Sequence, residues 1–102
     1  MQGTINYEIG DYIKIRSWKD MKEEFGENSC GNIACKFAFV KEMKPLCGLI
    51  AEITAFDVSA GNVHLRFINA PSGIDTCWCY SFDMIEPISK EDKEDALYDS
   101  LI

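Results

Sequence analysis

The sequence predicts a single, mainly β domain: a small, partly open, five-stranded barrel with one short helix after the first strand and a possible C-terminal helix. Three observations predict it. A chain of 102 residues has room for one core, and its 47% hydrophobic and 12% aromatic content is enough to build that core. Short β-rich segments also alternate with tight-turn residues along most of the chain.

The first two elements are a strand and a helix. In "GDYIKIRS", Ile13 and Ile15 alternate with polar residues, which is typical of a strand with one buried face. In "SWKDMKEEFG" the spacing becomes helical, over about two turns. Ser17 can cap the first turn of this helix and Gly26 can close the last one.

The next part of the chain is less regular. Turn-forming residues occupy positions 28–32, and the segment that follows them is either a strand or an ordered loop. In "FVKEMKPLCG", Val40 and Met43 lie three residues apart and Pro45 follows closely. This spacing predicts a single helical turn whose apolar residues close one end of the core.

Three segments then give the clearest β signal. "GLIAEITAFD" and "NVHLRFIN" are joined by a short turn, and "TCWCYSF" follows the turn "APSGID", which predicts a three-stranded antiparallel meander. In the third strand we expect Trp78, Tyr80 and Phe82 to face the core. Cys77 and Cys79 are then expected to face the other way.

The C-terminal part changes in composition. "DMIEPI" predicts a short turn and a terminal edge strand, where Pro87 is tolerated because an edge strand need not donate every ladder bond. Residues 86–102 carry six acids and two bases, a charge of −4 within the total of −7. We therefore divide the chain into a barrel domain, residues 1–88, and an acidic tail or amphipathic helix, residues 89–102.

This order of elements predicts a barrel of the SH3-like kind. The segments "GDYIKIRSWKDM", "FVKEMKPLCG" and "CWCYSFDMIEP" resemble a group of small bacteriophage and prophage proteins of largely unassigned function. In that group a "GDxVxIRSW" opening, a "FVxxMxxLCGxxxxI" middle and a "WxxxxxMIEP" end recur. The resemblance covers residues 10–87 and implies a fold and a phage or mobile-element setting. This chain differs in "NSCGNIACKF" and in its acidic tail, where we expect protein-specific function to lie.

The five cysteines are Cys30, Cys35, Cys47, Cys77 and Cys79. Their odd number excludes a closed disulfide framework, so we expect free thiols in a reducing compartment that fill small spaces. A zinc site would need Cys30 and Cys35 to converge with Cys77, Cys79 and His64. Neither cysteine pair has the spacing of a familiar zinc ribbon. We therefore expect no metal and no cofactor, with a small zinc-binding or thiol protein as the least favoured alternative.

The charge and the absent motifs narrow the functional class. Ten basic and seventeen acidic residues disfavour direct binding to nucleic acid, and they suit a partner with a basic groove. The sequence shows no signal peptide and no apolar run of the roughly 18 residues that cross a bilayer, so we expect a cytoplasmic protein without a membrane partner. With one histidine, no Ser-His-Asp order and no phosphate loop, we expect no enzyme and no catalytic residues.

The leading hypothesis is a non-catalytic, acidic protein-binding module that occludes a surface of a host protein. That host protein would be a nucleic-acid-handling defence enzyme, inhibited in an anti-CRISPR-like way. The alternative is an assembly component of a phage particle that self-associates through its edge strand and C-terminal helix, and the oligomeric state is left open. The predicted binding residues are Tyr12, Arg16, Trp18, Glu91, Asp92, Glu94 and Asp95.

Overall fold

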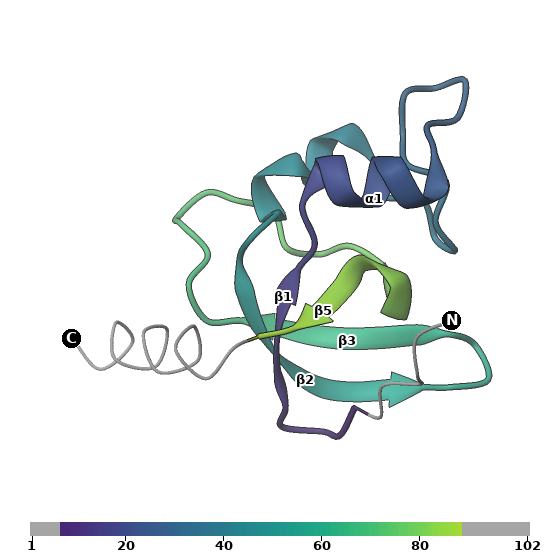
Figure 1. Ribbon diagram of the computed structural model, residues 1–102. Coiled ribbons are helices and arrows are strands. Elements are labelled where there is room, and N and C mark those ends of the chain that lie inside the picture. The colour runs from purple at the N-terminus through teal and green to yellow at the C-terminus, as the bar shows by residue number, and fades with distance from the viewer. Residues whose placement is uncertain (1–6, 89–102) are drawn as a thin grey trace.

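The computed structural model describes residues 7–88, which form one open, antiparallel, five-stranded sheet with helices packed at one end (Figure 1). The strands are β1 (Tyr12–Ile15), β2 (Ile50–Asp57), β3 (Asn62–Phe67), β4 (Tyr80–Ser81) and β5 (Ile85–Pro87). The helices are α1 (Trp18–Phe25) and the 3-10 helices η1 (Lys41–Leu46) and η2 (Phe82–Met84). The strand order β4-β3-β2-β1-β5 confirms the mainly β, five-stranded prediction.

Strand β1 lies inside the sheet and supplies the centre of the core. Ile13 and Ile15 are fully buried, as their alternation predicted. Ile13 stands opposite Ala51 of β2 on one side, and Ile15 stands opposite Ile85 of β5 on the other. Because both neighbours pair with it, β1 holds the two halves of the sheet together.

Helix α1 follows β1 after a short connection and begins and ends where the sequence predicts. The hydroxyl of Ser17 accepts the main-chain N–H of Asp20 at 3.0 Å, which caps the first turn. Gly26 ends the helix with a φ of 79°, a left-handed value that favours glycine. Met21 is fully buried, and the helix therefore packs its apolar face on the core.

The predicted helical turn near Met43 is the 3-10 helix η1. Met43 and Leu46 are buried, and Figure 1 shows η1 beside α1 at the same end of the sheet. The two helices touch, because the Lys44 ammonium lies 4.4 Å from the centre of the Trp18 ring. Together they close one end of the core, as expected.

The segment between α1 and η1, left open by the sequence, is an ordered loop. Its centre is a narrow main-chain bridge: Ile33 donates to the carbonyl of Phe39 and accepts from its N–H, both at 3.0 Å. Both side chains are fully buried. The loop is therefore fixed to the core from within, without forming a strand of the sheet.

The predicted meander is present as β2, β3 and β4, but the third strand is much shorter than expected. The sequence predicts a strand over residues 76–82, whereas β4 contains only Tyr80 and Ser81 and passes into η2. Burial alternates as predicted only up to Tyr80: Cys77 and Cys79 are exposed, Trp78 is half-buried and Tyr80 is buried, but Ser81 is buried as well. The predicted strand is therefore wrong in its length and in its second half, where Ser81 does not face away from the core.

The predicted turn and terminal edge strand are η2 and β5. Strand β5 pairs with β1 at the edge opposite β4, and Pro87 stands opposite Ile13. The predicted acidic tail or helix, residues 89–102, lies outside the described residues. Within residues 7–88 no helix is long and apolar enough to cross a membrane.

Arg16, just after β1, connects three elements. Its Nε donates to Asp20 of α1 at 2.8 Å, and its Nη2 pairs with Glu24 one turn further on. Its Nη1 donates to the main-chain carbonyl of Asp83 in η2 at 3.0 Å, and the guanidinium lies 5.3 Å from the centre of the Phe25 ring. Only 13% of its side chain is exposed, so the contacts are partly screened from water.

Replacing this guanidinium should destabilise the fold. Arg16→Met keeps much of the side-chain volume but loses every hydrogen bond of the guanidinium, and we expect a loss of about 1–3 kcal/mol in the free energy of unfolding. Urea denaturation measures it. Lys19→Met, an exposed change on the same helix, is the control and should cost under about 0.5 kcal/mol. Equal losses in the two variants would contradict this role for Arg16.

Candidate functional site

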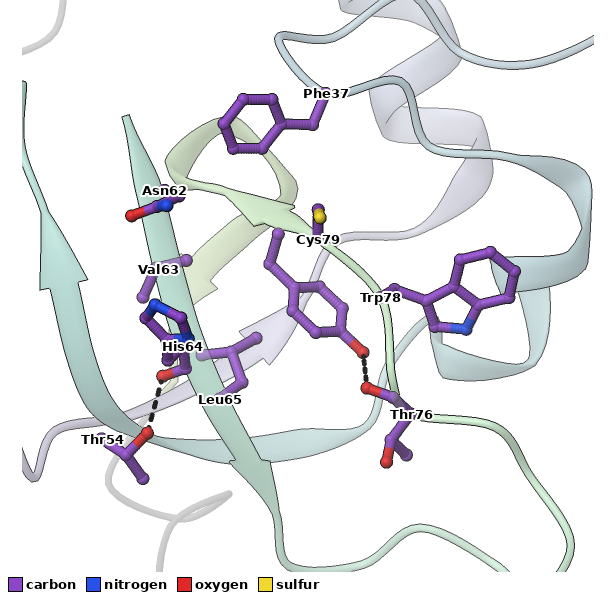
Figure 2. A pocket seen from close by; sticks show the side chains of 10 residues that line it. Phe37, Thr54, Asn62, Val63, His64, Leu65, Thr76, Trp78 and Cys79 are labelled. Carbon is purple, nitrogen blue, oxygen red and sulfur yellow. Dashed lines mark hydrogen bonds between the residues drawn. The ribbon is translucent and has the colours of Figure 1, made fainter. Parts of the chain in front are cut away.

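A groove of about 550 Å³ lies between β3 and the chain that leads into β4 (Figure 2). Figure 2 shows Val63 and Leu65 on one side of it, Thr76 and Trp78 on the other, and Phe37 above one end. It is open to solvent and has a mixed apolar and polar lining. The lining residues are Phe37, Thr54, Asn62, Val63, His64, Leu65, Thr76, Trp78, Cys79 and Tyr80.

The groove exists because residues 75–78 hydrogen-bond among themselves. The carboxylate of Asp75 accepts the N–H of Cys77 at 2.9 Å, and the carbonyl of Thr76 accepts the N–H of Trp78 at 3.0 Å. The indole N–H of Trp78 donates to the carbonyl of Asp75, also at 3.0 Å. Because the Asx turn at Asp75 uses main-chain N–H groups that a strand would donate to β3, this segment separates from β3. Pairing between the two begins only at Tyr80.

Tyr80 anchors the separated segment to the core. Its ring packs against Phe67 of β3, with centroids 5.7 Å apart, and its hydroxyl donates to the carbonyl of Thr76 at 2.7 Å. Burial, aided by the nearby carboxylate of Asp75, raises the pKa of the Tyr80 phenol. The raised pKa lets the phenol keep its proton to a higher pH than an exposed tyrosine would, and its hydrogen bond ties Thr76 to Tyr80 on the same wall of the groove.

The polar groups of the lining lie on or near β3. Thr54, at an irregularity in β2, donates its hydroxyl to the carbonyl of His64 at 3.3 Å, while the imidazole of His64 is exposed. The side-chain oxygen Oδ1 of Asn62 is buried and accepts no hydrogen bond within the described residues. A buried acceptor without a donor is costly, so a ligand N–H reaching Asn62 would relieve that cost.

The loop between α1 and η1 supplies the end of the groove. Lys36 donates its main-chain N–H to the carboxylate of Asp83 at 2.9 Å. Its side chain lies over the β2–β3 turn, where a Cβ on Gly61 would stand 2.5 Å from Lys36 Cε. These contacts hold Phe37 over the groove (Figure 2).

The cysteines do not gather into a metal site. Among residues 7–88 no three His, Cys, Asp or Glu side chains are grouped to hold an ion, so the cysteine pairs and His64 do not converge. Cys30, Cys77 and Cys79 are exposed, whereas Cys35 and Cys47 are half-buried. The expectation that the thiols fill small spaces therefore fits only the latter two.

Of the predicted binding residues, three lie in the described part of the chain. Trp18 is half-buried between Phe39, with ring centroids 6.1 Å apart, and Lys44, so it serves the core more than an exposed surface. The guanidinium of Arg16 makes its contacts within the fold. Tyr12 is partly exposed on β1. None of them lines the groove, and their contact with a partner stays a prediction.

The four predicted acids of the tail, Glu91, Asp92, Glu94 and Asp95, lie outside the described residues. Sequence reasoning missed the groove entirely, because it extended the third strand to residue 76. The signal that could have found it is Asp75, whose side chain readily caps its own following turn and so delays a strand.

Comparison with known proteins adds no relative: no protein-family model, no curated protein and no solved structure matches the chain.

The cysteines should differ in reactivity. Burial raises the pKa of the Cys35 and Cys47 thiols, so at pH about 8 fewer of them are thiolates, and we expect them to react with iodoacetamide roughly tenfold or more slowly than exposed Cys79. Timed labelling with peptide mass spectrometry measures each rate. The rates should converge in denaturant. Equal rates in the folded protein would contradict the burial of Cys35 and Cys47.

Proposed function

We propose that the protein is a non-catalytic binding module whose groove beside β3 receives a segment of a partner protein. The observation that carries this is the groove itself, which combines aromatic and aliphatic walls with a few fixed polar groups. That composition is typical of sites that bind peptides and other ligands. Tyr80 and the Asp83-anchored loop hold its walls in place, so little ordering is needed on binding.

The charge of the chain supports a basic partner. Residues 7–88 contain twelve acids and eight bases, and residues 89–102 contain five acids and two bases, so both parts contribute to the total of −7. Complementary charge speeds association and selects partners. The partner we propose is a host protein with a basic nucleic-acid-binding groove, such as a defence enzyme. The chain itself is then a phage-encoded, SH3-like protein of the bacterial cytoplasm that occludes that groove.

One observation favours the second candidate, an assembly component that self-associates. The hairpin between β2 and β3 exposes Val58 by 75%, and the segment before β1 exposes Ile9 by 67%. Apolar side chains at protruding positions suit contacts between copies. Sedimentation velocity at two concentrations separates the candidates, because a module that binds a foreign partner stays monomeric at both.

A matched pair of cysteines tests the groove. Cys79 lines it and Cys77, two residues away, does not, although both are exposed. We expect Cys79→Arg to fill the groove and reduce partner capture from host lysate at least about tenfold, whereas Cys77→Arg adds the same charge outside it and leaves capture nearly unchanged. Quantitative mass spectrometry of the captured proteins measures this, with thermal unfolding as the check on folding. Equal capture by both variants would contradict the groove as the binding site.

The tail tests the electrostatic part of the proposal. Reversing Glu91, Asp92, Glu94 and Asp95 to lysine changes the net charge by eight units and should weaken capture by about tenfold at low salt. The difference from the wild type should shrink as salt rises. Replacing Ser89 and Ser100 by alanine is the uncharged control. An unchanged affinity at low salt would exclude these acids from the binding surface.

A further inference from the structure

We infer that the partner segment binds as an added β-strand on the free edge of β3, at Leu65 and Phe67. The occupant is an extended segment of another protein, with alternating apolar residues and basic flanks. This inference rests on the proposed function and names how the groove would be used.

The first step is the direction of the main-chain groups of β3. The carbonyl of His64 accepts from Thr54 of β2 at 3.3 Å, and the N–H of Ile68, just after β3, donates to Ile50 at 3.0 Å. In an antiparallel ladder the two polar groups of a residue point to the same neighbour, and successive residues alternate. The even-numbered residues 64–68 therefore face β2, and the odd-numbered ones face the opposite edge.

The second step is that β4 covers only the start of this edge. Val63 pairs with Tyr80, and β4 ends the pairing there. Within residues 7–88, no main-chain hydrogen bond joins Leu65 or Phe67 to the segment across the groove. In that segment the N–H groups of Cys77 and Trp78 donate to acceptors of the segment itself. The N–H and C=O groups of Leu65 and Phe67 are thus available to a strand.

The third step is that the edge opens into the groove. Leu65 forms part of the lining, and the facing wall is the segment from Thr76 to Tyr80, so an entering chain lies against β3 itself (Figure 2). Alternate side chains of an added strand point to opposite faces of the sheet. One set meets the apolar side of the groove near Leu65, and the other points to the opposite face of the sheet.

The fourth step is charge, which selects a foreign strand over a second copy. Edge pairing between two copies would bring together two chains that each carry −7. Arg66, between the two free positions, is paired with Glu52 of β2 and does not offset this charge. A strand with lysines at its ends meets no such repulsion.

The probe is a short synthetic peptide of alternating valine and threonine with lysine at both ends. We expect it to slow hydrogen exchange of the Leu65 and Phe67 amides by tenfold or more, as measured by NMR. Two N-methylated versions, each blocking alternate residues, separate main-chain pairing from simple burial. One should bind about tenfold more weakly because it loses the donors that face β3, and the other should bind within about threefold.

Cys79→Arg should abolish the peptide-induced protection and Cys77→Arg should keep it. The inference is overturned by equal effects of the two methylation patterns, by no binding up to about 1 mM peptide, or by protection of the same amides through dimerisation without peptide. If host proteins are captured through the groove while either of the first two results holds, the proposed function stands and only strand addition fails. If neither capture nor peptide binding depends on Cys79, both fail.

Discussion

The guanidinium of Arg16 is the contact on which the arrangement of the other elements depends. It leaves β1, binds the carboxylates of Asp20 and Glu24 on α1, and donates to the main chain of Asp83 in η2. A lysine has one charged nitrogen and cannot reproduce this planar set of donors directed at three partners. The first strand, the first helix and the return of the chain from β4 to β5 are therefore fixed relative to one another by one side chain.

The groove also depends on Arg16, through its contact with Asp83. The main chain of Asp83 is held by Arg16, and its carboxylate accepts from the hydroxyl of Ser81 and from the N–H of Lys36. Ser81 belongs to β4, which sets where pairing with β3 begins, and Lys36 positions the loop that carries Phe37. The carboxylate of Asp83 thus contacts both β4 and the loop that carries Phe37, although Asp83 does not line the groove itself.

Most of the fold was predictable, because short-range patterns determine it. The alternation at Ile13 and Ile15, and the capping residues Ser17 and Gly26, each give enough local information to place β1 and α1. The third meander strand was predicted too long, since residues 76–79 have a strand-like pattern but the N–H groups of Cys77 and Trp78 are taken by nearby acceptors.

The groove was not predictable for a different reason. It is bounded by residues from the loop, β3 and the segment before β4, and no pattern along the chain relates positions 37, 64 and 78. The groove also depends on residues 76–79 not pairing with β3, and strand propensity does not predict this. The predicted binding residues Arg16 and Trp18 make contacts within the fold that hold α1 against the core, and their contact with a partner stays a prediction.

An unpaired strand edge normally invites aggregation, and the features around β3 show how this protein can keep one. The free stretch is short, since it begins beyond Val63 and ends with β3 at Phe67. The segment from Thr76 to Tyr80 stands across from it and so restricts the approach of a broad flat sheet. Like charge opposes pairing with a second copy. These features restrict access in shape and in charge together, and the same two restrictions would give a binding edge its selectivity.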